Sequence, residues 1–184
     1  MGSDAALWGS TTWRVLSYEY AAFWAGLLHD WTPNYPFQPW LMFISYGFLH
    51  AGPVHFLVNM LTLLSLGAPL AAKVGSRRFL VLYTASLIGG GFGFAAFGTE
   101  SAPMVGASGA LFGLVGALLS LEFDARAAKG QSLWPVLQAV LGLGALNLIL
   151  WWAMDGRLAW ETHLGGFLTG WLVAVLISVR APSS

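Results

Sequence analysis

The spacing of charged residues constrains the fold of this chain more than any other feature of the sequence. Its eight basic and eight acidic residues make up only 9% of 184 positions, against about 25% in ordinary soluble domains. Five long intervals carry no charge at all: 54–72, 79–97, 105–121, 133–154 and 162–179. Because a bilayer core about 30 Å thick is crossed by about 20 apolar residues in a helix, the intervals predict an all-α polytopic membrane protein with five transmembrane helices.

Basic residues between these intervals predict an orientation. If the five helices alternate in direction, six basic residues fall on one side of the membrane: Lys73, Arg77, Arg78, Arg126, Lys129 and Arg180. Only Arg14 and Arg157 need fall on the other side. An excess of lysine and arginine marks the cytoplasmic side. The starts of the first, third and fifth intervals, with His55, Ser108 and His163, are therefore expected near the outer leaflet.

The N-terminal part has a less decided pattern. Residues 5–28 are apolar enough for a helix, but Arg14 and Glu19 would each be costly near the bilayer centre. We favour an interfacial or peripheral helix over a sixth span. Residues 31–40 then bring three prolines, which break helices, and several aromatic residues, which suit the headgroup level. This segment is expected to form an irregular loop at the outer membrane surface.

Composition excludes several kinds of function. The chain has no cysteine, which rules out disulfides and thiol catalysis. Its net charge is zero, so there is no basic patch for nucleic acid. Its four histidines lack the His-Glu-x-x-His pattern of helix-borne zinc proteases. We expect no metal, no cofactor and no nucleic-acid partner.

A few polar residues interrupt the apolar intervals. Ser108 stands in the run Gly106-Ala107-Ser108-Gly109, His163 opens the fifth interval, and His55 and Asn59 lie at i and i+4, on one helix face. Ser108 alone could bond back to its own helix. His55 and Asn59 could either join helices by hydrogen bonds or donate to a developing oxyanion. The residues by themselves leave these alternatives open.

Glycines recur at helical spacing in two of the intervals. Gly106, Gly109, Gly113 and Gly116 are expected to form one glycine face on the 105–121 helix. Gly166 and Gly170 follow His163 along one face of the 162–179 helix. Small residues let membrane helices approach closely. We therefore predict that these two faces dock and that the docking sets His163 opposite Ser108.

Three motifs together resemble the signature regions of rhomboid intramembrane serine proteases. They are His50-Ala51-Gly52 followed by His55-Phe56-Leu57-Val58-Asn59, then Gly106-Ala107-Ser108-Gly109-Ala110-Leu111-Phe112-Gly113, then His163-Leu164-Gly165-Gly166-Phe167-Leu168-Thr169-Gly170. The resemblance covers roughly residues 38–180 and implies a rhomboid-like helical bundle. On this reading residues 1–37 form an N-terminal peripheral segment and outer loop, and residues 181–184 a short tail.

The resemblance also implies roles for single residues. Ser108 would be the nucleophile and His163 the base of a catalytic dyad, because no acidic residue stands where it could orient His163. The side chains of His55 and Asn59 and the backbone N–H of Ser108 would form the oxyanion hole. Phe112 occupies the aromatic position expected to stack on the catalytic imidazole. His50, Gly106, Gly109, Gly166 and Gly170 would support the site.

Two departures from the family pattern stand out. Rhomboids commonly carry Trp-Arg in the loop before the first histidine region, where this chain has Trp40-Leu41, so the arginine that would brace the loop is absent. The basic rhomboid fold also has six helices. If residues 5–28 do not span the membrane, the first of these helices is missing from this sequence.

The function implied is that of an intramembrane serine endopeptidase that cleaves transmembrane segments near the outer leaflet. Its expected partners are single-span membrane-protein substrates and membrane lipids, and its expected location is the bacterial inner membrane, with the active site opening outward. The sequence does not specify an oligomeric state. Two alternatives are a catalytically silent rhomboid-like protein that binds membrane-protein clients, and a small transporter, for which inverted repeats and charges at the membrane midplane would be expected.

Overall fold

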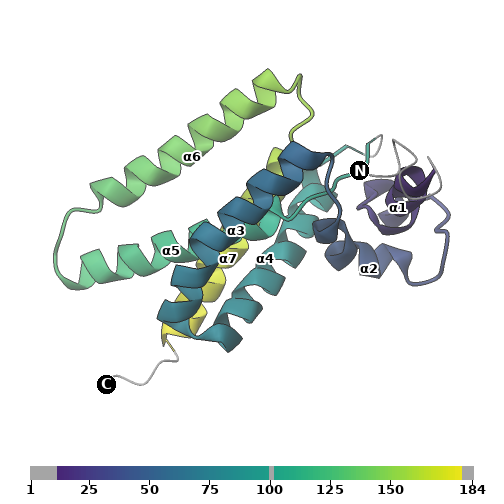
Figure 1. The fold of residues 1–184 in the computed structure, drawn as a ribbon. Helices are drawn as coiled ribbons and strands as arrows, with labels where there is room; N and C mark the ends of the chain where they lie inside the picture. The colour runs from purple at the N-terminus through teal and green to yellow at the C-terminus, as the bar shows by residue number, and fades with distance from the viewer. Residues whose placement is uncertain (1–11, 100–101, 180–184) are drawn as a thin grey trace.

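The long uncharged intervals form the long helices of the structure. A computed structural model describes residues 12–99 and 102–179, and this part of the chain is helical apart from turns and one isolated β-bridge (Figure 1). The α-helices are α1 (Trp13–Ala21), α2 (Gln38–Ser45), α3 (Pro53–Val74), α4 (Ser76–Phe97), α5 (Ser108–Ala128), α6 (Trp134–Ala153) and α7 (Trp160–Val179). Short 3-10 helices lie at η1 (Ala25–Leu28) and η2 (Tyr46–Phe48).

Helices α3 to α7 are long and apolar enough to cross a membrane. The prediction of an all-α bundle with five such helices is confirmed. The bounds of α5 differ from the predicted ones, since the helix begins at Ser108 and continues beyond residue 121 to Ala128. In this extension Arg126 and Glu122 form an ion pair of 2.6 Å at i and i+4, a spacing that favours helix where the apolar sequence has ended.

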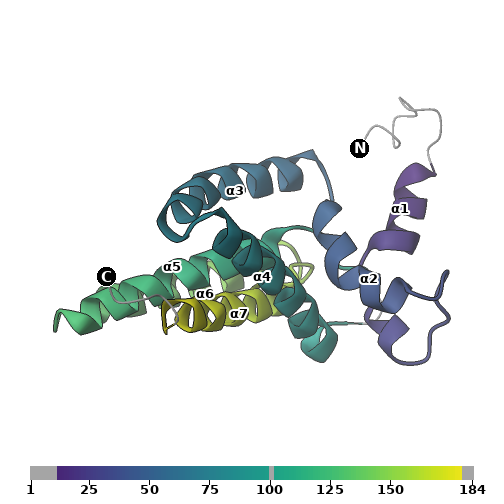
Figure 2. The ribbon, with the colours of Figure 1, turned by 90° about the horizontal axis from the view of Figure 1, so that it is seen from below.

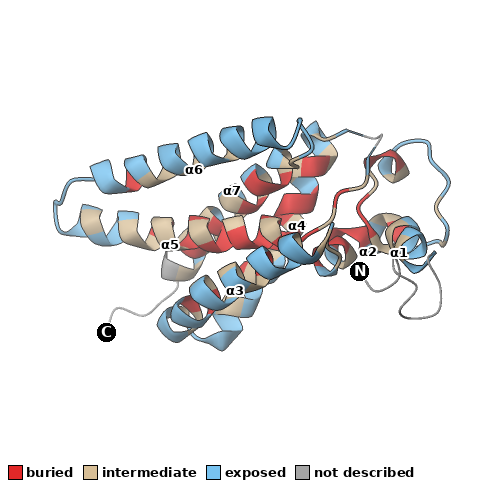
Figure 3. Ribbon diagram, turned by 45° about the horizontal axis from the view of Figure 1, so that its top comes forward, coloured by how far each residue is buried: buried red, intermediate tan, exposed pale blue. Residues whose placement is uncertain are grey.

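The bundle is packed tightly around α4, α5 and α7 and loosely around α6. One buried cluster joins α3, α4, α5 and α7 through Leu70, Leu82, Leu111, Leu114, Ala117 and Ala174. Across the fully described helix α6, Val136 alone is buried. Figure 3 shows α6 mostly exposed, beside an α5 that is buried mainly in its N-terminal half. In a bilayer such exposed apolar surface would face lipid.

Consecutive long helices run in opposite directions (Figure 1, Figure 2), the arrangement that the assignment of the basic residues to one side assumed. The turn between α3 and α4, at Gly75, has a positive φ of 85° that suits glycine. Figure 2 shows this turn and the C-terminal ends of α5 and α7 on one side of the molecule, opposite α1 and α2. Lys73, Arg77 and Arg126 therefore lie toward one end, and the first residues of α3, α5 and α7 lie toward the other. Arg180 is outside the described residues.

The N-terminal segment differs from a single helix over residues 5–28. Residues 1–11 lie outside the described part, and α1 covers nine residues, a rise of about 14 Å, too short for a bilayer core. The chain is then extended around Phe23, whose backbone pairs with Met104 by hydrogen bonds of 3.0 and 2.9 Å. Buried Phe23 thus satisfies its backbone groups on the loop before α5 and not within a helix.

The segment 31–40 is less irregular than predicted. Pro39 does not break a helix but occupies the first turn of α2, where the missing proline N–H costs nothing. The buried side chain of Gln38 accepts a hydrogen bond from Asn34 N–H at 2.7 Å and donates to the carbonyl of Glu19 at 2.5 Å. These bonds fix the start of α2 against the end of α1.

Candidate active site

Ser108 is the first residue of α5, and a glycine turn holds it there. Gly106 has a φ of +127°, and its N–H donates to the carbonyl of Tyr46 at 3.0 Å. A Cβ at Gly106 would also lie 2.6 Å from Cε1 of His55. Gly106 is therefore required in the turn before α5, for its backbone conformation and for contact with His55. The expectation that it belongs to the glycine face of the helix is wrong.

His163 lies in the first turn of α7 and faces Ser108. Its side chain is buried, and its Nε2 is 2.9 Å from Ser108 Oγ. This distance is within the range of a nucleophile hydrogen-bonded to its base. The imidazole stacks on Phe112, with ring centroids 4.1 Å apart and planes 5° apart, so the predicted stack is present. Phe112 comes one turn after Ser108, so one helix supplies both the hydroxyl and the stacked ring.

The other ring nitrogen of His163 has a partner on α6. His163 Nδ1 is 2.7 Å from Oδ1 of Asn147. Because an amide oxygen only accepts hydrogen bonds, Nδ1–H donates to Asn147, and Nε2 carries the lone pair that faces the Ser108 hydroxyl. The sequence alone did not indicate a role for Asn147. Its signal was a polar side chain within an uncharged interval, which nothing local connects to His163.

His55 is oriented by the loop that precedes α3. The N–H of Ala51 donates to His55 Nδ1 at 3.2 Å, so neutral His55 carries its hydrogen on Nε2, the side of the ring near Gly106. His50 packs edge-on against His55, with ring centroids 5.3 Å apart. The structure thus brings His55 next to the turn that carries Ser108.

Asn59 lies one turn after His55 and is buried. Its Nδ2 donates to the carbonyl of His55 at 2.7 Å, which leaves the second hydrogen of Nδ2 available. Its Oδ1 has no hydrogen-bond partner among the described residues. One hydrogen of the Asn59 amide is therefore bonded to its own helix, and the second hydrogen is available for another acceptor.

Glycines bring α5 and α7 into backbone contact. A Cβ at Gly166 would lie 1.9 Å from the carbonyl oxygen of Gly109, and a Cβ at Gly170 would lie 1.9 Å from that of Gly113. At Gly116 a Cβ would lie 2.3 Å from the carbonyl oxygen of Phe167. The predicted docking of the two glycine faces is confirmed for these residues. This docking places the first turns of the two helices side by side.

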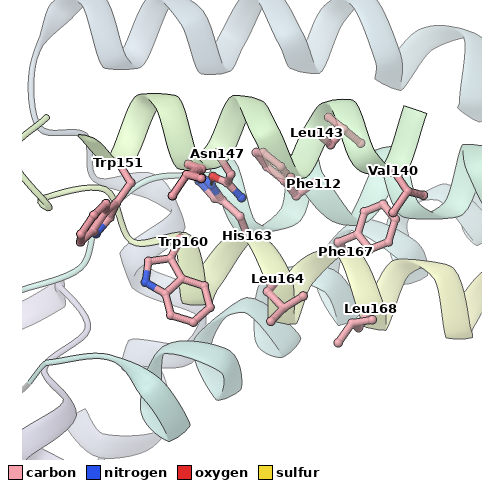
Figure 4. A pocket seen from close by; sticks show the side chains of 12 residues that line it. Phe112, Val140, Leu143, Asn147, Trp151, Trp160, His163, Leu164, Phe167 and Leu168 are labelled. Atoms are coloured by element: carbon pink, nitrogen blue, oxygen red, sulfur yellow. Dashed lines mark hydrogen bonds between the residues drawn. The ribbon is translucent and has the colours of Figure 1, made fainter. Parts of the chain in front are cut away.

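A cavity of about 620 Å³ opens beside His163, between α5, α6 and α7. Figure 4 shows Asn147 and His163 meeting at this cavity, with Phe112 beside them and Trp151 and Trp160 toward one end. Its walls are otherwise almost wholly apolar. Within residues 12–99 and 102–179, no three histidine, aspartate or glutamate side chains gather in a way that could hold a metal ion.

A family model for the Rhomboid domain matches residues 37–180 of the chain, which include every residue of this site. The chain belongs to the rhomboid family. The match contains the three motif regions on which the resemblance was first based. The fold described above is therefore that of a rhomboid domain.

Relatives of this rhomboid include active and inactive proteins by name. It is 36% identical to RHOMBOID-like protein 4 of Arabidopsis thaliana over 74% of this chain and 34% of the relative. It is 31% identical to Rhomboid protease GluP of Bacillus subtilis (strain 168) over 76% of this chain and 26% of the relative. It is 33% identical to Inactive rhomboid protein 2 of Homo sapiens over 81% of this chain and 17% of the relative. The chain thus spans about a third or less of these relatives.

This rhomboid braces the loop before α3 from its N-terminal helix. Leu41, which stands where rhomboids commonly carry an arginine, is half exposed on α2. The guanidinium of Arg14 on α1 instead donates to the carbonyl of Ala51, and Tyr18 Oη donates to the carbonyl of His50 at 3.2 Å. Residues 50–51 are therefore held by α1, a connection that Leu41 cannot supply and that the sequence did not indicate.

Proposed function

We propose that this rhomboid is an intramembrane serine endopeptidase in which Ser108 is the nucleophile and His163 the base. The observation that carries the proposal is the 2.9 Å contact between Ser108 Oγ and His163 Nε2, on a ring stacked against Phe112. A buried imidazole in hydrogen-bond contact with a serine at a helix start is the arrangement that activates a hydroxyl for attack.

The reaction follows from these groups. His163 Nε2 takes the proton of Ser108 as Oγ bonds to the carbonyl carbon of a substrate peptide. The same proton then passes to the leaving nitrogen as the C–N bond breaks. A water, deprotonated by His163, next attacks the acyl ester, and the ester bond to Ser108 breaks to release the acid and restore the hydroxyl.

The oxyanion formed in each addition needs donors beside Ser108. The backbone N–H of Ser108 belongs to the first, unpaired N–H groups of α5. His55 presents Nε2–H toward the turn at Gly106, and Asn59 keeps one amide hydrogen. These three groups are the proposed oxyanion hole. In other enzymes, removal of one donor of this kind lowers the catalytic rate by about 10²–10³.

The proposed substrates are single-span membrane proteins with helix-destabilising or small residues near the scissile bond, because a helical peptide bond is sheltered by its own hydrogen bonds. The proposed catalytic domain is residues 38–180. The basic turns at Lys73–Arg78 and Arg126–Lys129 support a cytoplasmic position for the opposite end of the bundle. We place the protein in the bacterial inner membrane, with Ser108 toward the outer side.

The test is labelling of the purified protein, in detergent or lipid, by a fluorescent fluorophosphonate. Ser108→Ala and His163→Ala should both abolish labelling. Ser120→Ala is the matched control, because Ser120 is a buried serine of the same helix whose hydroxyl has no hydrogen-bond partner in the described structure, and it should label like the wild type. Cleavage of a single-span substrate in liposomes should likewise be lost in Ser108→Ala and His163→Ala and kept in Ser120→Ala.

The other candidate function is that of a catalytically silent rhomboid-like protein that binds membrane-protein clients. The similarity to Inactive rhomboid protein 2 supports this alternative. The two functions give opposite results in this assay. Absence of labelling in folded wild-type protein would reject the protease, and labelling that survives in Ser108→Ala would reject Ser108 as nucleophile.

A further inference from the structure

We propose that Asn147 is a positioning residue, so that the site is a triad of Ser108, His163 and Asn147. The inference rests on the proposed protease function and extends it. Three observations carry it. Asn147 Oδ1 lies 2.7 Å from His163 Nδ1, the other ring nitrogen of His163 contacts Ser108 Oγ, and the His163 side chain is buried.

The contact fixes which tautomer of His163 faces Ser108. A neutral imidazole carries one hydrogen, and the bond made by one nitrogen decides the state of the other. Asn147 Oδ1 accepts from Nδ1–H, so Nε2 is left as the acceptor that general-base catalysis needs. With Nε2 protonated instead, the ring could not take the proton of Ser108.

Asn147 also stabilises the ring after it has become charged. Once His163 has taken the serine proton, both ring nitrogens donate, and Nδ1–H still points at an amide oxygen. Glu161 lies two residues before His163, which corresponds to a rotation of about 200° around α7. Its side chain therefore belongs to a different face of the helix. Asn147 is thus the group that the structure gives His163 in place of the carboxylate of a conventional triad.

This third member comes from the least packed helix of the bundle. Asn147 is half-buried at the edge of the cavity beside α6, and its side chain reaches across to His163 (Figure 4). Around it the face of α6 is exposed and apolar. The position of α6 therefore bears on the orientation of the imidazole, although Ser108 and His163 belong to the tightly docked pair α5 and α7.

The experiment measures the maximal rate of inactivation by a fluorophosphonate, and the probe concentration at half that rate, in Asn147→Leu and Asn147→Asp. Leucine removes the acceptor at similar size, whereas aspartate keeps an oxygen that accepts from Nδ1–H. Gln138→Leu is the matched control, since it removes an exposed amide from the same helix. Thermal unfolding of each variant is recorded beside the rates.

We expect the maximal rate to fall about tenfold in Asn147→Leu, the loss typical of one hydrogen bond, with the half-rate concentration unchanged. Asn147→Asp should stay within about threefold of the wild type, and Gln138→Leu should equal it. If Asn147→Leu does not fold, Asn147→Ala takes its place against Asn147→Asp.

Two results would overturn the inference while the protease stands. One is a wild-type rate in the leucine or alanine variant. The other is an equal loss in the aspartate variant with folding intact, which would mean that Asn147 only joins helices. A wild type that does not label would overturn the protease itself, and the triad with it.

Discussion

Gly166 of α7 lies against Gly109 of α5 so closely that a Cβ on Gly166 would come within 1.9 Å of the Gly109 carbonyl oxygen. Backbone cannot yield as a flexible side chain can, so the two helices approach only because neither residue has a side chain. Ser108 precedes Gly109, and His163 comes three residues before Gly166. The hydrogen bond between Ser108 and His163 therefore depends on this contact.

Gly166→Ala should separate α5 from α7, because its methyl group collides with backbone. We expect a loss of about 1–3 kcal/mol in the free energy of unfolding and loss of fluorophosphonate labelling. The matched control is Gly142→Ala on α6, where a Cβ would meet nothing within 4 Å. This variant should keep both the wild-type stability and the fluorophosphonate labelling. Equal thermal stability of the two variants would contradict the proposed role of the contact.

Phe112→Ala should slow labelling without abolishing it. The ring of Phe112 lies parallel to that of His163 at 4.1 Å, and aromatic pairs contribute about 0.5–1.5 kcal/mol, which corresponds to roughly two- to tenfold in rate. Phe123→Ala is the comparison, because Phe123 lies on the same helix but packs on Trp171. If Phe123→Ala slows labelling as much as Phe112→Ala, the stack has no special part in the reaction.

Arg14→Ala should loosen the loop that orients His55. Its guanidinium donates to the carbonyl of Ala51, the residue whose N–H donates to His55 Nδ1. Loss of a hydrogen bond from a charged donor should lower the free energy of unfolding by about 1 kcal/mol, given its partial exposure, and should reduce the rate of substrate cleavage. Arg78→Ala, an exposed arginine at the other end of the bundle, provides the comparison. A wild-type cleavage rate in Arg14→Ala would show that α1 does not support the site.

His50 should make the protein less stable in mild acid. Burial, and then the charge of nearby His55, lower the pKa of His50 from its ordinary 6.5. Well above pH 6.5 both the folded and the unfolded chain hold His50 neutral. As the pH falls below 6.5 the unfolded chain binds the proton first, so the folded state loses stability. The melting temperature between pH 7.5 and 5 should fall less steeply in His50→Gln than in the wild type, and an identical slope would contradict this account.

The sequence by itself determined the five long apolar helices and predicted a site between them. Runs without charge specify transmembrane helices because an apolar environment penalises charge along the whole segment, and this is a local property of each run. Glycine spacing specified the faces on which α5 and α7 meet, as Gly109 and Gly166 show. The resemblance to the rhomboid signature regions predicted roles for Ser108, His163 and Phe112 together, because the motifs are short and follow in a fixed order along the chain.

The tertiary structure alone decided which distant groups meet. Asn147 and Arg14 are single polar residues on helices whose rotation and tilt no local pattern fixes, so their contacts with His163 and Ala51 follow from how the helices pack. Gly106 was placed on the wrong element for a related reason. Spacing of three residues is shared by a helix face and by a turn just before it, and only the pairing of Gly106 with Tyr46 and His55 separates the two.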